Sequence, residues 1–291
     1  MMEEKFFTLE QIWKDAKAFL ESKGVPDADL DAWYLMEEIW QIDRSFYYAH
    51  KKEAVSREKQ KEQLEQYRHY LLRRGEREPL QHILGHAYFM ELKFLVNSHV
   101  LIPRPDTEIL AEEARKRLRP DSRVLDLCTG SGCILLSLLY HCPRVEGTGA
   151  DISWEALMVA EENSRRLKLP AKFIQSDLFE NITGRFQMIV SNPPYIPSGG
   201  IDSLMEEVRR YDPRLALDGG ADGLDFYRRL LKESREYLIP GGVILLEIGS
   251  DQGAWVQARM EALGYQKVQI IKDLSGLDRV VLGYVPEEKG E

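Results

Sequence analysis

The sequence predicts an α/β fold in which a helical amino-terminal part precedes an open, mostly parallel sheet. Two observations lead to this expectation. Apolar residues recur at helical spacing from Phe7 to about Arg74. From Val124 onward, short apolar runs instead end in acidic or amide side chains, and the first run leads through a glycine loop into an apolar helix. Strand, loop and helix in this order are typical of a doubly wound sheet.

Length and composition set the broad class. A chain of 291 residues with 44% hydrophobic content can form one large and one smaller domain. No apolar run reaches membrane-spanning length, and the start at Met1–Lys5 lacks the basic flank and apolar stretch of a signal peptide. We therefore expect a cytoplasmic protein with no membrane association.

Charge and cysteine content exclude other classes. The formal net charge of −9 argues against general neutralisation of nucleic-acid phosphates, which needs a basic face. The basic residues Arg73, Arg74 and Arg77, and the run 115–119, are expected on solvated helix faces. The three cysteines form no C-x-x-C pair and are odd in number, which favours neither a disulfide framework nor a zinc site: Cys128, Cys133 and Cys142.

Residues 1–78 are predicted to form a helical domain. Gly24–Pro26 separates the first two helices, and the charged stretch Glu53–Arg74 is typical of a surface helix. Residues 79–103 are expected to form a linker, because apolar residues alternate from Tyr88 to Val96 as in a short hairpin. His82 and His86 stand four apart, but Gly85 lies between them and no third ligand is evident, so no metal is expected.

Residues 104–291 are predicted to form the sheet domain, and its first loop indicates a nucleotide-like ligand. A dinucleotide fingerprint would require glycine at positions 130, 132 and 135, but position 135 is Leu. An acidic residue near the end of the strand, Asp126, followed by alternate glycines is typical of the nucleoside loop of S-adenosylmethionine methyltransferases. The expected loop residues are Cys128, Thr129, Gly130, Ser131 and Gly132.

Acidic residues at successive strand ends support the same ligand. Asp126 is expected to face the ammonium group of an amino-acid tail. Asp151 closes the next strand, where a ribose diol would lie. Asp177 and Leu178 follow the third strand, 172–175, and are expected to meet an adenine amino group and ring. Each acid taken alone is better explained as a helix cap. Three acids in register, each at the end of a predicted strand, indicate a ligand instead.

The stretch Asn192-Pro193-Pro194-Tyr195 follows an apolar strand, 188–191, and two prolines prevent further helix or sheet pairing. The Asn192 side-chain oxygen and the Pro193 carbonyl are two acceptors that match the two donors of a planar –NH2 group. The ring of Tyr195 can hold that group flat. A plain proline turn with Asn192 as a cap is the alternative.

The remaining chain is expected to complete the sheet. A long loop, 196–224, is predicted to act as a lid or substrate wall. Its aspartates do not match a calcium loop, because position 220 is Gly and the twelfth position is Arg229. A strand at 243–247 and a hairpin of strands at 265–271 and 279–284 follow.

Taken together, the chain closely resembles the HemK/PrmC family, the protein-(glutamine-N5) methyltransferases that modify the Gly-Gly-Gln loop of class 1 peptide-chain release factors. Cys128 stands where glycine is commoner, and Asp106 where Glu is common. Cysteine at position 128 narrows the glycine loop near the methionine part of the cofactor. Neither Cys128 nor Asp106 removes a group that the chemistry needs. The segments that carry the resemblance are 78–85, Pro103–Glu108, 126–132, Asn192–Tyr195, Ala216–Gly220 and Leu246–Gly249.

The resemblance implies a Rossmann-like class I methyltransferase domain that uses S-adenosylmethionine, with S-adenosylhomocysteine as product and no metal. It assigns the loop residues, Asp151, Leu178 and Asn192 to the cofactor, and Asn192, Pro193, Pro194 and Tyr195 to the substrate glutamine. Catalysis would rest on Asn192, Pro193 and Tyr195. A monomer acting on release factors is expected, with residues 1–78 docking the substrate. Adenine-N6 methyltransferases share Asn-Pro-Pro-Tyr and are the alternative, whereas direct nucleic-acid binding is disfavoured by the acidic charge.

Overall fold

A computed structural model describes residues 7–56 and 58–287, and its internal contacts divide the chain into two units. The helical unit extends to Gly85 and also includes Met205–Tyr211, while the sheet unit has His86–Leu204 and the chain from Asp212 onward. The chain therefore returns once from the second unit to the first. Within the described ranges, no helix is long and apolar enough to cross a membrane.

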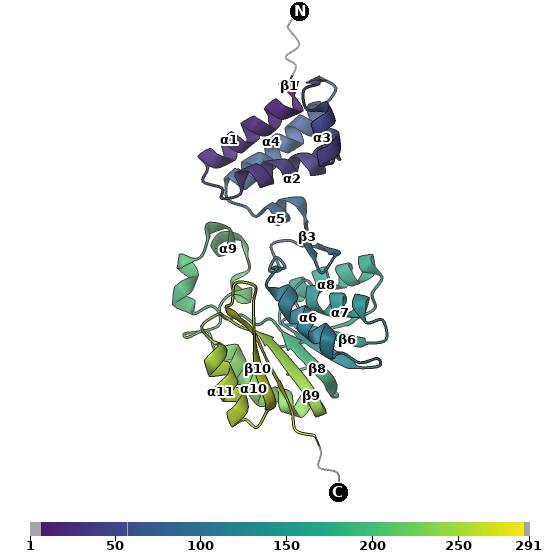
Figure 1. Cartoon of the computed structure of the whole chain (residues 1–291), viewed down its shortest axis with the longest axis vertical. Coiled ribbons are helices and arrows are strands. Elements are labelled where there is room, and N and C mark those ends of the chain that lie inside the picture. The colour runs from purple at the N-terminus through teal and green to yellow at the C-terminus, as the bar shows by residue number, and fades with distance from the viewer. Residues whose placement is uncertain (1–6, 57, 288–291) are drawn as a thin grey trace, which may run out of the picture. The chain divides into compact units, whose positions relative to one another are not determined.

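The helical unit is a small bundle with a minimal two-stranded sheet (Figure 1). Its elements are β1 (Phe7–Thr8), α1 (Leu9–Ser22), α2 (Ala28–Trp40), α3 (Arg44–His50), β2 (Ala54–Val55), α4 (Lys61–Gly75), α5 (Leu80–Leu84) and α9 (Glu206–Tyr211). The predicted helical character and the break between the first two helices are confirmed.

Helix α1 shows why these segments are helical. The Thr8 side chain caps its start by accepting a hydrogen bond from the Gln11 N–H at 3.1 Å, and four apolar residues at helical spacing face the core: Leu9, Ile12, Ala16 and Leu20. On α2, Trp33 and Met36 are buried as expected, but Leu30 and Tyr34 are 46% and 44% exposed. Helical spacing of apolar residues therefore did not decide which of them face the core.

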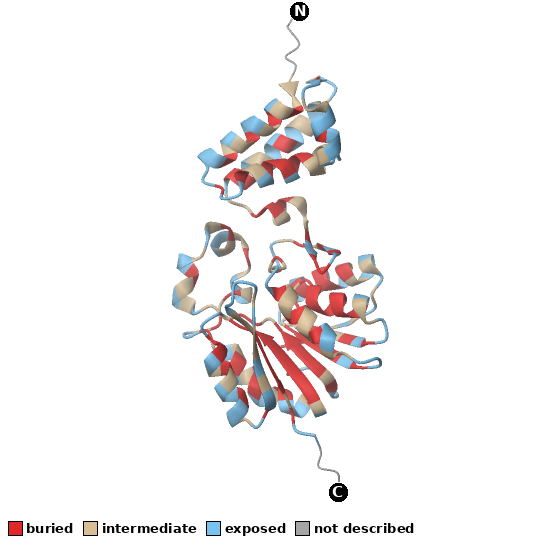
Figure 2. Cartoon of the chain, in the orientation of Figure 1, coloured by how far each residue is buried: buried red, intermediate tan, exposed pale blue. Residues whose placement is uncertain are grey.

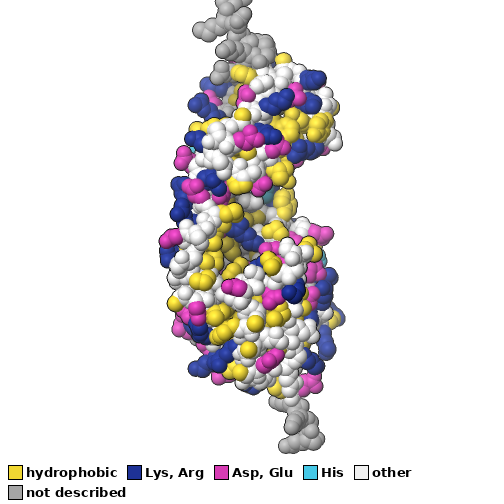
Figure 3. All heavy atoms as spheres, turned by 60° about the vertical axis from the view of Figure 1, so that its left-hand side comes forward, with side chains coloured by type: hydrophobic (Ala, Val, Ile, Leu, Met, Phe, Trp, Pro, Cys, Tyr) yellow, Lys and Arg dark blue, Asp and Glu magenta, His cyan; other side chains and the backbone are white. Residues whose placement is uncertain are grey.

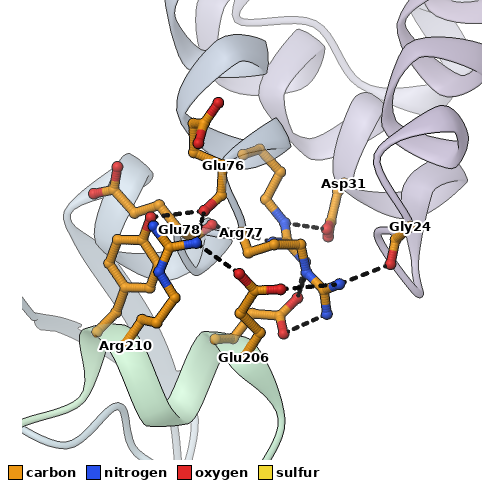
Figure 4. Close-up of polar contacts among 10 residues, drawn as sticks. Gly24, Asp31, Glu76, Arg77, Glu78, Glu206 and Arg210 are labelled. Atoms are coloured by element: carbon orange, nitrogen blue, oxygen red, sulfur yellow. Dashed lines mark hydrogen bonds and ion pairs between the residues drawn. The ribbon is translucent and has the colours of Figure 1, made fainter.

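Helix α4 is more deeply packed than its charged sequence suggests. Arg74 is only 5% exposed, so the prediction of a solvated side chain is wrong. Its guanidinium donates to Asp31 at 2.6 Å and to Glu207 of α9 at 3.1 Å. Figure 4 shows Asp31 and Arg77 among the polar contacts at this place. Arg77 also donates to both oxygens of Glu207, at 2.8 and 2.6 Å. Two arginines therefore share one buried carboxylate.

The sheet unit contains a mixed seven-stranded sheet with the order β10-β11-β9-β8-β5-β6-β7. The five strands from β9 to β7 run parallel, whereas β11 is antiparallel to both of its neighbours. The strands are β5 (Arg123–Leu127), β6 (Glu146–Asp151), β7 (Lys172–Gln175), β8 (Phe186–Ser191), β9 (Leu238–Glu247), β10 (Gln266–Lys272) and β11 (Asp278–Tyr284).

Helices cover both faces of this sheet (Figure 1). They are α6 (Thr107–Arg117), α7 (Cys133–His141), α8 (Trp154–Leu167), α10 (Asp225–Tyr237) and α11 (Gly253–Ala262), with β3 (His86–Phe89) and β4 (Leu92–Leu95) forming the expected hairpin before them. The Arg115–Arg117 stretch of α6 pairs with acidic residues of its own helix, which agrees with a solvated face.

Successive side chains along the central strands point to opposite faces of the sheet and contribute to two apolar cores. Val124, Met188 and Val243 pack with α6 and α7, whereas their sequence neighbours Leu125, Ile189 and Ile244 pack with α10 and α11. The central strands are consequently buried along nearly their whole length (Figure 2). Continuous apolar sequence is what a parallel strand covered on both faces requires.

Strand order reverses between β5 and β8, because the chain moves outward to β7 before it returns to β8. In open α/β sheets the crevice at such a reversal, outside the carboxyl ends of the strands, is where ligands bind. The loop after β5 and Asn192 after β8 both lie at this position. The topology thus brings together the two segments that the sequence singled out.

The stretch from Ile196 to Leu224 was expected to be a loop without secondary structure, and this is only partly correct. It contains the short helices η1 (Ser198–Ser203), α9 and η2 (Arg214–Ala216). The contacts of α9 assign it to the helical unit. The reason is the long-range pairing of Glu207 with Arg74 and Arg77, which no local pattern encodes.

We expect Glu207→Gln to lower the free energy of unfolding of the helical unit by about 3–5 kcal/mol, because two arginines lose a buried carboxylate partner. Urea unfolding followed by tryptophan fluorescence would measure this, since Trp13, Trp33 and Trp40 lie in that unit. The matched control is Glu206→Gln, whose carboxylate is 37% exposed and should contribute about 0–1 kcal/mol. If both substitutions change the free energy of unfolding equally, Glu207 is not the buried carboxylate that holds the two arginines.

Candidate active site

A cavity of about 240 Å³ opens at the carboxyl ends of β5, β6, β7 and β8. Nine of the residues selected from the sequence contribute to its wall: Cys128, Thr129, Gly130, Ser131, Asp151, Asp177, Leu178, Asn192 and Pro194. Four others do not reach the wall: Asp126, Gly132, Pro193 and Tyr195. The cavity therefore joins the expected cofactor loops to Asn192.

The glycine loop after β5 is held in shape by its own residues. The Thr129 hydroxyl donates to the Asp126 carboxylate at 2.6 Å, and the Thr129 N–H donates to the Ala150 carbonyl at 3.0 Å. Asp126 is fully buried, and burial raises its pKa to about 7. The carboxylate acts on the cavity through Thr129 rather than by direct contact, which corrects the expected ammonium contact of Asp126.

Two backbone positions explain the residues of this loop. Gly132 has φ +77° before α7, and a Cβ there would come within 3.3 Å of both Ala160 and Leu136, so this glycine is required for packing. Cys128 also has a positive φ, 57°, where a side chain costs about 1–2 kcal/mol. This backbone conformation would favour glycine over cysteine at position 128. Burial, and then the Asp151 charge, raise the pKa of the Cys128 thiol, which argues against a thiolate nucleophile.

Asp151 ends β6 at the centre of the wall. One carboxylate oxygen accepts from the Gly130 N–H at 2.9 Å and the other from the Ser153 N–H at 3.0 Å. Each oxygen keeps a second lone pair for a hydroxyl of a ligand. Burial raises the pKa of Asp151, whereas the backbone donors oppose that rise. The side chain can therefore fix the loop and bind a diol together.

Asp177 and Leu178 follow β7, and α10 contributes two wall residues that the sequence did not single out. Arg229 forms an ion pair with Asp177 at 2.8 Å, and Phe226 lines the same cavity. Leu178 is 4% exposed. The Asp177 carboxylate thus has a protein partner already. The helical periodicity of residues 225–237 alone gave no indication that one face of α10 reaches the ligand crevice.

Asn192 leaves the sheet directly after β8. The preceding Ser191 is fully buried, and its hydroxyl donates to the Leu127 carbonyl of β5 at 2.7 Å. Asn192 and Pro194 then face the cavity, whereas Pro193 is buried and Tyr195 packs against the core beneath α10. Burial, and then the Glu247 charge, raise the pKa of Tyr195 to about 12, so its hydroxyl stays protonated near neutral pH.

The backbone after Tyr195 is clamped by the segment Leu217–Gly219. The Ile196 N–H donates to the Leu217 carbonyl at 3.0 Å, and the Gly219 N–H donates to the Ile196 carbonyl at 2.8 Å. A Cβ on Gly219 would lie 2.8 Å from the Tyr195 Cα, so only glycine fits. The Gln252 side chain donates to the Tyr195 carbonyl at 2.9 Å. Asn192–Tyr195 therefore has a fixed backbone.

Two further segments complete the wall and were not assigned to the site from sequence. One is the stretch 99–104 with Thr107, and the other is Pro213 with residues 215 and 216. They are joined by Arg104, which donates to the buried Asp212 at 2.6 Å. Burial raises the pKa of Asp212 to about 6 against the effect of Arg104. The described residues contain no group of three or more metal-ligating side chains.

Known proteins match both units. The family profile described as the PrmC N-terminal domain matches residues 11–85, and that of the methyltransferase small domain matches residues 104–208. Among solved structures, a methyltransferase from Pyrococcus furiosus has a TM-score of 0.51 at 20% identity, over 66% of this chain and 88% of its own. That likeness concerns the fold.

Curated relatives extend the match along the chain. A release factor glutamine methyltransferase of Geobacter sulfurreducens is 38% identical over 282 residues, 97% of this chain and 98% of its own. The same enzyme of Caulobacter vibrioides is 42% identical over 284 residues, 95% of this chain and 96% of its own. The sheet unit has the Rossmann-like class I methyltransferase fold, and the chain belongs to the release factor glutamine methyltransferase family.

Proposed function

We propose that this protein transfers a methyl group from S-adenosylmethionine to the side-chain amide nitrogen, N5, of a release-factor glutamine. The glutamine is that of the Gly-Gly-Gln motif of class 1 peptide-chain release factors, so the reaction supports translation termination. The observation that carries the proposal is that Asn192 lines the same cavity as Asp151 and Leu178. An amide-binding group and a nucleoside-binding wall share one space. Action on release factors implies a cytoplasmic site of work.

The wall fits S-adenosylmethionine. Gly130 leaves open space beside its backbone, since a Cβ there would meet nothing within 4 Å. Asp151 has free lone pairs for the ribose hydroxyls, and Leu178 with Phe226 offers apolar contact to the base. Thr129 and Ser131 would flank the amino-acid tail. When bound, the cofactor supplies an electrophilic methyl group and leaves as S-adenosylhomocysteine; the chemistry calls for no metal.

Asn192 would orient the substrate amide from the cavity wall, and the carbonyl of Pro193, a residue outside the lining of the cavity, is the proposed second acceptor. If the two oxygen acceptors hold both N–H bonds out of the amide plane, the nitrogen lone pair loses its conjugation with the carbonyl and can be aimed at the methyl group. Breaking amide conjugation costs about 18–20 kcal/mol, and two such hydrogen bonds return about 1.5–3 kcal/mol each. Positioning in the closed cavity adds about 7–11 kcal/mol. A strong electrophile must supply the remainder.

Pro194 lines the cavity and would border the amide, whereas the ring of Tyr195 would support the amide from the core side of the wall. Because the hydroxyl of Tyr195 remains protonated near neutral pH, we assign it no role as a base. The glutamine nitrogen that accepts the methyl group becomes acidic on methylation, so its proton can leave to water.

An adenine-N6 methyltransferase is the alternative, because adenine presents the same planar –NH2 group. Basic and acidic side chains are intermixed on the face shown in Figure 3, and the net charge is −9. A nucleic-acid enzyme would need a basic track. Incubation with labelled S-adenosylmethionine and either release factor or nucleic acid distinguishes the two; label in nucleic acid alone would overturn the proposal.

Asn192→Ala should lower turnover roughly 100- to 1,000-fold, as removal of one oriented hydrogen-bonding group commonly does, while the affinity for S-adenosylmethionine changes little. Asp151→Ala should instead weaken cofactor binding, because Asp151 both shapes the loop and faces the diol. Steady-state kinetics and calorimetry on both variants separate the roles. Turnover of Asn192→Ala within a few-fold of the parent would contradict the proposed role of Asn192.

Gly219→Ala should lower turnover by about 100-fold, the effect of displacing a reacting group by about 1 Å. The new methyl group would lie 2.8 Å from the Tyr195 Cα and 2.9 Å from the Pro194 carbonyl oxygen. Gly199→Ala is the matched control, since its Cβ would meet nothing within 4 Å. If both variants retain parental kinetics, the backbone clamp does not set the active geometry.

We further propose that the helical unit docks the release factor, because one glutamine side chain offers too little surface to select a protein. Deletion of residues 1–78 would test this poorly, since it would also remove Arg74 and Arg77 from Glu207 of α9. The exposed apolar pair Leu30 and Tyr34 on α2 offers point substitutions instead.

Tyr34→Glu combined with Leu30→Glu should lower kcat/KM for intact release factor roughly 5- to 30-fold, as loss of interface contacts does. Methylation of a short Gly-Gly-Gln peptide and the cofactor affinity should not change. Tyr140→Glu in the sheet unit is the control, because Tyr140 is 50% exposed. Parental kcat/KM for the intact protein would exclude this face of α2 as the docking surface.

A further inference from the structure

Two segments that carry the family resemblance meet at Asn192, although neither has a role in the chemistry described so far. Thr107, from Pro103–Glu108, is the first residue of α6, and Glu247, from Leu246–Gly249, is the last residue of β9. Both are buried, at 3% and 2% exposure, and Thr107 also lines the cavity. Their side chains therefore lie behind the amide that faces the substrate.

Asn192, Thr107 and Glu247 form a chain of polar side chains, which we call the relay. The Asn192 amide nitrogen, Nδ2, donates to the Thr107 hydroxyl oxygen at 3.2 Å. Hydrogen bonding from Thr107 and Asn192 to the Glu247 carboxylate lowers the pKa of Glu247 against the effect of burial. When Glu247 is ionised its carboxylate only accepts, so a Thr107 hydroxyl that donates to it can accept only from a donor such as Nδ2.

This direction of donation determines which end of the Asn192 amide faces the cavity. With Nδ2 donating to Thr107, the oxygen Oδ1 is left for the substrate. A flipped amide would set Oδ1 against an oxygen of Glu247 and would present an –NH2 group to the –NH2 group of the substrate. Two donors facing each other cannot form a hydrogen bond.

The surroundings of Glu247 act on its ionisation in opposite directions. Burial raises the pKa of Glu247 to about 7, whereas the hydrogen bonds from Thr107 and Asn192 and the charge of Arg279 act in the opposite direction. Arg279 is itself held by Asp273 at 3.0 Å and lies 3.6 Å from Asp106. Oε2 of Glu247 has no hydrogen-bond partner among the described residues. A buried carboxylate kept for packing alone would be costly.

We propose that Thr107 and Glu247 are positioning residues that orient the Asn192 amide, so that its oxygen rather than its nitrogen faces the substrate –NH2 group. The inference rests on the proposed methyl transfer, and it assigns a task to each of the two segments. Neither residue touches the reacting atoms in this account. They act by removing one of two amide orientations that an unsupported asparagine would populate.

The test uses the full-length protein and compares Thr107→Val with Thr107→Ser. Valine keeps the shape but has no hydroxyl, so we expect kcat to fall roughly 10- to 100-fold with KM for release factor and cofactor affinity little changed. Serine keeps the hydroxyl and should restore kcat to within a few-fold of the parent. A role in packing alone predicts the reverse order, because serine removes a buried methyl group whereas valine does not.

Glu247→Gln provides the second arm in case one variant folds poorly. A neutral amide can both donate and accept, so it no longer dictates the direction of the Thr107 hydroxyl, and kcat should fall. Since the two residues act as one unit, Thr107→Val added to Glu247→Gln should cause little further loss. If the two substitutions lower kcat by independent factors that multiply in the double variant, the proposed relay is wrong.

Different results would refute the proposed methyl transfer and the positioning role of Thr107. If the parent enzyme does not methylate release factor, the proposed function itself is wrong. If the parent is active and Thr107→Val retains its kcat, only the positioning role is wrong. Thermal unfolding and cofactor calorimetry on each variant distinguish a loss of fold from a loss of orientation.

Discussion

The site depends on the abrupt departure of the chain from the sheet after β8. Two consecutive prolines cannot continue a strand, so the backbone must leave the sheet after β8. At this point the chain segments that follow the neighbouring strands β5 and β8 diverge. Left alone, such a turn would be loosely defined. Here the Ile196 backbone pairs with Leu217 and Gly219, and Gln252 holds the Tyr195 carbonyl. A short stretch with few internal restraints is thereby given one conformation by residues far along the chain.

The cofactor side of the cavity is likewise held in one conformation by contacts with other parts of the chain. Asp151 is positioned by backbone N–H groups of the glycine loop and of its own turn, and Asp126 secures Thr129 from behind. Both acids are therefore structural as well as available for binding, directly for Asp151 and through Thr129 for Asp126. Because the loop is fixed before a ligand arrives, little ordering cost remains for binding. The positive φ of Cys128 is tolerated within this rigid setting.

The helical unit is connected to the site by more than the linker before Gly85. The chain re-enters the unit at Met205 and leaves it at Tyr211, between the Asn192–Tyr195 turn and the Leu217–Gly219 clamp. The re-entering helix α9 is fixed by Arg74 and Arg77, which share the buried Glu207. The segment between the turn and its clamp is thus anchored in the unit for which we propose substrate docking.

The sequence by itself determined the fold class, the two kinds of domain, the hairpins, the strand and loop around Asp126 and the importance of Asn192–Tyr195. Periodicity, glycine and proline are local signals, and the backbone obeys them locally. Only the tertiary structure decided that Asp126 lies behind the cavity wall, that Arg229 pairs with Asp177 and that Arg74 is buried. Only the fold, too, brings Thr107, Asn192 and Glu247 together. These contacts join residues some 40 to 140 positions apart, and no local pattern of charge or hydropathy specifies which distant partner a side chain will meet.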